Sequence, residues 1–109
     1  MSSKIIVAPF SLAQRLAAEE RNAIDAIDAA TSRSAAAMRE ITLLWQEGER
    51  GAALAAARTT FANAAREERA TREKCEPQRR KARARLDAVL RSLAPDVREA
   101  VEQTAYAGL

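Results

Sequence analysis

Histidine is absent from the 109-residue chain, cysteine occurs once, glycine three times, and aromatic residues make up 4%. Without histidine there is no Ser-His-Asp triad, no Cys-His dyad and no zinc site that needs imidazole. One cysteine cannot form a disulfide framework or a CxxC redox site, and three glycines cannot build a glycine-rich phosphate loop. We therefore expect a chain that is not an enzyme and that holds no cofactor and no metal.

Long apolar runs are also missing. No apolar segment approaches the ~18 residues that a membrane span requires, and the N-terminal segment, which carries one lysine and Pro9, lacks the pattern of a signal peptide. We expect a cytoplasmic protein with a reduced thiol and no membrane contact.

Alanine is the residue that the chain has in abundance, at 27 of 109 positions. It is the strongest helix former, but it buries little apolar area. A core lined with alanine must bring helix backbones close together to gain dispersion contacts. The composition therefore predicts an all-α fold with a thin core.

Two long antiparallel helices joined by a tight turn are predicted. Residues 11–14 match a capping box, which places the first helix at about 12–47, with Gly48 as its C-terminal cap. The second helix is expected at about 52–93. Its apolar positions keep their 3-4 spacing past Pro77, which favours one helix kinked near that proline. Two helices divided there are the alternative.

The two ends of the chain are predicted to differ. Residues 1–10 are expected to form a short extended arm, because β-branched residues precede Pro9. A proline followed by an aspartate suits the start of a short C-terminal helix at 95–107. Together with the hairpin at 11–94, these segments are expected to form a single helical domain, 1–109.

The hairpin turn sets the register of the two long helices, because facing residue numbers should sum to about 99. The predicted pairs include Trp45 with Leu54, Thr31 with Glu68, and Glu20 with Arg79. The last pair would neutralise two charges that interrupt the apolar stripes. Cys75 lies on the stripe of the second helix and is expected to be a buried core residue.

Basic residues concentrate in one stretch. Residues 66–85 hold nine cations and four acids, whereas residues 1–50 carry a net charge of −1. Three interpretations stay open: a solvated helix surface, a docking surface for an acidic protein, and a contact to nucleic acid. The candidate residues for binding a partner or phosphate are Arg72, Arg79, Arg80, Lys81, Arg83 and Arg85.

Helical spacing distributes the densest part of this stretch over two sides. Arg79, Arg80 and Arg83 are expected on one side of the helix. Lys81 and Arg85 are expected on another. No aromatic residue lies nearby to stack on a base, so a nucleic-acid contact would be made to phosphates.

The candidate interface anchors are Leu43, Leu44 and Trp45. Because they are consecutive, they cannot all face the same helix. Trp45 has two interpretations: it plugs the end of the hairpin, or it is exposed and anchors an interface.

These features favour a non-enzymatic protein–protein interaction module. An adaptor, a chaperone or an inhibitor of a larger complex, of the kind that phages and mobile elements encode, would fit. The chain is expected to bind a protein partner and to form a homodimer, because a thin alanine core leaves apolar positions uncovered. The alternative is a nucleic-acid-associated protein that binds phosphates through Arg79–Arg85.

Overall fold

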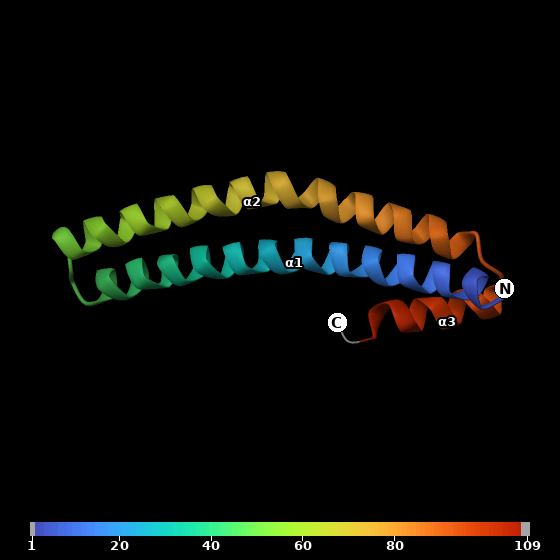
Figure 1. Cartoon of the computed structure of the whole chain (residues 1–109). Coiled ribbons are helices and arrows are strands. Elements are labelled where there is room, and N and C mark those ends of the chain that lie inside the picture. Colours follow the sequence, from blue (N-terminus) through green and yellow to red (C-terminus); the bar gives the residue numbers. More distant parts are fainter. Residues whose placement is uncertain (1, 108–109) are drawn as a thin grey trace. The chain divides into compact units, whose positions relative to one another are not determined.

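A computed structural model describes the backbone of residues 2–107 and the side chains of residues 10–107. It contains α1 (Ser2–Gln46), α2 (Ala52–Arg91) and α3 (Pro95–Tyr106), and the described residues form no strand (Figure 1). The predicted all-α fold, a long helical hairpin followed by a short C-terminal helix, is confirmed.

The start of α1 corrects a prediction. The helix begins at Ser2, so the extended arm expected at 1–10 is wrong over its described part, and Ser11 lies inside the helix instead of capping it. An extended arm needs a partner strand for its backbone groups, whereas a helix satisfies them within itself. The β-branched residues cost only a few tenths of a kcal/mol each in a helix, and Pro9 removes one hydrogen bond.

The second helix passes Pro77 without a break, so the alternative of two helices divided there is wrong. A proline inside a helix removes one backbone hydrogen bond and costs about 3 kcal/mol. The turns that follow are held by burial, since Ala82, Leu86 and Leu90 are each no more than 6% exposed. The kink expected at this place stays a prediction.

The chain divides into two compact units. Unit 1 comprises Met1–Ile24 and Glu76–Leu109, and unit 2 comprises Asp25–Cys75. Both long helices contribute to each unit. The expectation of a single domain stays a prediction.

The core of unit 1 joins three helices, and α3 lies beside the first part of α1 (Figure 1). Leu16 of α1, Leu86 of α2 and Val101 of α3 are the largest fully buried side chains of the described chain. Small residues fill the space between them, which lets the helices approach closely. The other buried members of this cluster are Ala13, Ala17, Leu90 and Ala105.

Arg98 fixes the turn between α2 and α3. Its Nε donates to the Leu90 carbonyl at 2.8 Å, and its Nη2 donates to the Leu93 carbonyl at 3.1 Å. Carbonyls in the last turn of a helix lack intrahelical partners, and a nearby cation also interacts favourably with the helix dipole. The Arg98 side chain of α3 therefore caps the C-terminal end of α2.

Unit 2 is a two-helix hairpin with a thinner core. Its buried residues are Ile27, Ala30, Ser34, Ala37, Leu54, Ala57 and Cys75. The predicted register is confirmed at Thr31, whose hydroxyl donates to the Glu68 carboxylate at 3.4 Å. At the turn, Gly48 adopts a φ of 82°, which glycine takes at no steric cost, and its N–H donates to the Trp45 carbonyl at 3.1 Å.

Candidate functional site

The six cations predicted to bind a partner or phosphate divide into two groups. Three of them form ion pairs with neighbouring carboxylates: Arg72, Arg79 and Arg83. The other three are exposed and form no ion pair with any described side chain: Arg80, Lys81 and Arg85. Only the second group is free to meet an external anion.

The pairs of Arg72 and Arg79 lie within their own helix. Arg72 Nε lies 3.2 Å from Glu68 Oε2, and Arg72 Nη2 donates to the Thr31 hydroxyl at 2.9 Å. Arg79 donates from Nε and Nη2 to Glu76 Oε2, at 3.1 and 2.9 Å. Pairs three or four residues apart face each other on a helix, so these two guanidinium groups are occupied by the protein itself.

Arg83 brings together side chains from all three helices of unit 1. Its Nη1 lies 3.7 Å from Glu20 Oε1 and donates to the Tyr106 hydroxyl, and its Nη2 lies 3.2 Å from Asp87 Oδ1. The predicted Glu20–Arg79 pair is therefore wrong. Arg83 lies one helical turn further along α2, where Tyr106 of α3 contacts it.

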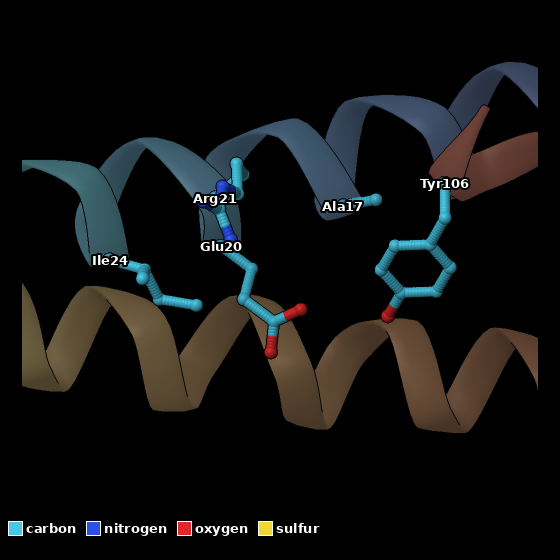
Figure 2. Close-up of a pocket in the computed structure, with 5 residues that line it drawn as sticks. All are labelled: Ala17, Glu20, Arg21, Ile24 and Tyr106. Atoms are coloured by element: carbon cyan, nitrogen blue, oxygen red, sulfur yellow. The ribbon is translucent and has the colours of Figure 1, made fainter. Parts of the chain in front are cut away.

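A cavity of about 360 Å³ lies beside this cluster and is lined by Ala17, Glu20, Arg21, Ile24 and Tyr106. Figure 2 shows the Glu20 carboxylate and the Tyr106 hydroxyl both directed toward α2. The Glu20 side chain is only 12% exposed, so it depends on Arg83 for charge compensation. The cavity can hold water or a small polar molecule.

The titration of the cluster follows from burial and charge. Burial raises the pKa of Tyr106 above its ordinary value, the Glu20 and Asp87 charges add to this, and the Arg83 charge partly offsets it. Burial lowers the pKa of Arg83, but attraction to Tyr106, Asp87 and Glu20 outweighs burial, and the net direction is upward. At neutral pH the phenol is protonated and the guanidinium charged, so this pair exchanges no proton there.

Alkaline pH should therefore weaken the folded chain through Tyr106. Because its folded pKa lies above the unfolded value of about 10, the neutral phenol stabilises the fold fully below about pH 10. This contribution is lost as pH rises through the folded pKa. The chain has one tyrosine, so titration of tyrosinate absorbance reports this group alone. We expect a higher midpoint for the folded chain than for the same chain in concentrated urea; equal midpoints would contradict the assignment.

Four exposed cations near the end of α2 lie on one solvent-facing side of the helix. We define the cationic ridge as Arg80, Lys81, Arg85 and Arg91, which are all exposed. At 3.6 residues per turn they fall within about 140° of the helix circumference. The expectation that Arg80 shares a side with Arg79 is wrong, because Arg79 is partly buried and paired whereas Arg80 faces solvent. Sequence reasoning also missed Arg91, although its spacing from Arg80 is three helical turns.

The candidate interface anchors lie at the hairpin end of unit 2. Leu43 is 53% exposed and Trp45 is 50% exposed, while Leu44 is partly buried. Met38, which lies seven residues before Trp45, is 44% exposed. We name the three exposed side chains at this end the hairpin-end patch: Met38, Leu43 and Trp45. Met38 and Trp45, seven residues apart, lie on the same side of α1, whereas Leu43 lies about 140–160° around the helix from them.

Trp45 does not plug the hairpin, so that interpretation is wrong. The Arg50 guanidinium carbon lies 3.3 Å from the centre of the Trp45 ring, and Arg50 Nη1 donates to the Trp45 carbonyl at 3.1 Å and the Glu49 carbonyl at 2.8 Å. This cation–π contact holds the ring at the turn. The predicted facing residue Leu54 is 3% exposed, whereas half of Trp45 stays exposed.

The single thiol, Cys75, lies in the core. Cys75 is a free thiol and 7% exposed, as its place on the apolar stripe predicted. Among residues 10–107, no group of three or more carboxylates or thiols is placed to hold a metal ion. No helix within the described range is long and apolar enough to cross a membrane.

Comparison with family models, with curated proteins and with solved structures gives no match to this chain. The described surface of the chain itself offers three features: the paired Arg83 cluster, the cationic ridge and the hairpin-end patch.

Proposed function

We propose that the chain is a non-enzymatic protein–protein interaction module that uses the hairpin-end patch of unit 2. One observation carries the proposal. Three of the four large apolar side chains that are exposed in the described part of the chain fall within eight residues of α1: Met38, Leu43 and Trp45. Large apolar residues that stay exposed at one end of a hairpin favour an interaction there, and tryptophan is enriched at binding hot spots. Met38 and Trp45 offer one side of α1 to a partner, and Leu43 offers the other.

The partner that fits this surface is a second copy of the chain. Residues 38–58, which include the patch and the turn, carry three arginines and three glutamates. A surface with no net charge can approach its own copy without repulsion. The core of unit 2 also gains from cover, because Ile27 and Leu54 are its only large buried aliphatic residues in the described chain.

Light scattering on the purified chain tests this proposal. We expect the mass of a dimer at micromolar concentration, and the mass of a monomer for the double variant Leu43→Ser, Trp45→Ser. Exposed positions tolerate serine with small effects on folding, so circular dichroism should give the same helix content for both.

A matched control separates the patch from a general effect of serine. Ala62→Ser with Ala70→Ser changes two exposed positions of α2 outside the patch and should leave the dimer intact. A monomeric wild type at micromolar concentration would overturn the proposal, as would loss of the dimer in this control.

A further inference from the structure

We infer that the cationic ridge of unit 1 binds the phosphate backbone of double-stranded nucleic acid without reading its sequence. This surface lies outside the hairpin-end patch and concerns a different class of partner. Three features of α2 support this binding: the segregation of charge along the helix, the spacing of the ridge, and the absence of aromatic and large apolar residues from it.

Charge segregation is the first observation. The last part of α2, residues 76–91, holds only two carboxylates, Glu76 and Asp87, and both are partly buried and paired. Their partners are Arg79 and Arg83, which lie on the side of the helix that faces the core. The solvent-facing side is left with four cations and no acid. Those cations attract anions because no described carboxylate competes for them.

The spacing of the ridge suits a nucleic-acid backbone. Arg80 and Arg91 are 11 residues apart, which corresponds to about 16 Å along a helix axis. A duplex presents one negative charge per about 1.7 Å of its axis, so a ridge of this length faces many phosphates. Three of the four ridge residues are arginines, whose planar guanidinium groups bind phosphate oxygens in a bidentate manner.

The residues between the cations favour nucleic acid over an acidic protein. The exposed residues between them are Ala84 and Ala88, and Pro77 lies just before the ridge on the same side of the helix. A protein interface draws most of its energy from buried aromatic and aliphatic anchors, and this face offers none. Phosphate contacts need only cations and the release of condensed counterions.

The same composition favours a duplex over a single strand, and contacts to phosphates over contacts to base edges. Proteins that bind single strands stack bases on aromatic side chains, whereas none of the four aromatic residues of the chain, Phe10, Trp45, Phe61 and Tyr106, falls within the ridge segment 80–91. Reading of base edges uses asparagine or glutamine as well as arginine. Gln78 is the only amide residue among residues 76–91.

Fluorescence anisotropy with the full chain and a labelled mixed-sequence duplex tests the inference. Four phosphate contacts predict a slope of about −3.6 for log K against log salt. Affinity should therefore fall about 150-fold between about 50 and about 200 mM salt. Absence of binding at the lower salt concentration would overturn the inference.

Two variants of equal charge locate the contact. Replacing Arg80, Lys81, Arg85 and Arg91 by Gln removes the ridge and should abolish binding. Replacing Arg15, Arg39, Arg58 and Arg69 by Gln removes four exposed cations outside the ridge and should retain most of it. Because both variants change the net charge from +3 to −1, an equal loss would mean that net charge alone is sensed, which contradicts a ridge site.

Two further probes test the kind of partner. Wild-type chain should bind the duplex more tightly than a single strand of the same length and more tightly than a polyglutamate peptide of the same charge. Preference for the single strand would contradict the duplex assignment. Preference for polyglutamate would assign the ridge to an acidic protein and overturn the inference.

Discussion

Replacing Leu86 by Ala should lower the free energy of unfolding by about 3–5 kcal/mol. Leu86 is 0% exposed and lies in the cluster that joins α1, α2 and α3. Removing a buried leucine side chain loses its transfer free energy and leaves a cavity. Neighbouring side chains include several alanines, which are too short to collapse into the space. The unfolding energy should be measured in urea at one fixed protein concentration, because self-association would add to it.

A conservative variant at the same position distinguishes packing from a general intolerance. Leu86→Met keeps nearly the same volume and should cost less than about 1.5 kcal/mol. If the alanine variant lost no more than the methionine variant, the core of unit 1 would not be the packed three-helix cluster described above. A large loss in both variants would point to a site that accepts only leucine.

Replacing Pro77 by Ala should have the opposite sign and raise the free energy of unfolding by about 2–3 kcal/mol. Pro77 is exposed and lies inside the continuous helix α2. Alanine would supply the N–H that donates to the carbonyl four residues earlier, and it would remove the clash of the proline ring. Urea unfolding again provides the measurement.

The neighbouring position provides the control for this gain. Gln78→Ala changes an exposed residue of the same helix and should alter stability by no more than about 0.5 kcal/mol. An unchanged or lower stability in Pro77→Ala would mean that the packing of the adjoining turns requires a bend at this proline. That outcome would contradict the prediction that alanine fits position 77 of α2 better than proline.

Local patterns in the sequence were sufficient for the elements of the fold. The spacing of apolar residues and the pair of glycines gave two long helices and the turn, and the Pro-Asp pair marked α3. The register derived from the turn placed Thr31 opposite Glu68, and the structure has that hydrogen bond. Burial of Cys75 followed from the same periodicity.

Predictions from local sequence failed where contacts with distant residues decided the outcome. β-branched residues before Pro9 favour an extended arm, but no described strand is present to pair with one, so the helix continues to Ser2. Trp45 was open to two interpretations because a large apolar residue near a turn fits either. The choice depended on Arg50, which holds the ring at the turn while Leu54 is already buried.

The sequence by itself therefore determined the helices, the turn and the excess of positive charge in the second helix, because each depends on residues close together in the chain. Only the tertiary structure decided what the charges do. Arg79 and Arg83 lie one turn apart on the same side of α2. Arg83, which also contacts Tyr106 of α3, is the one that pairs with Glu20. The pairs Arg79–Glu76 and Arg83–Asp87 are local, but the contact of Arg83 with Glu20 needs the packing of α1 against α2, and the other cations of residues 76–91 face solvent as the ridge.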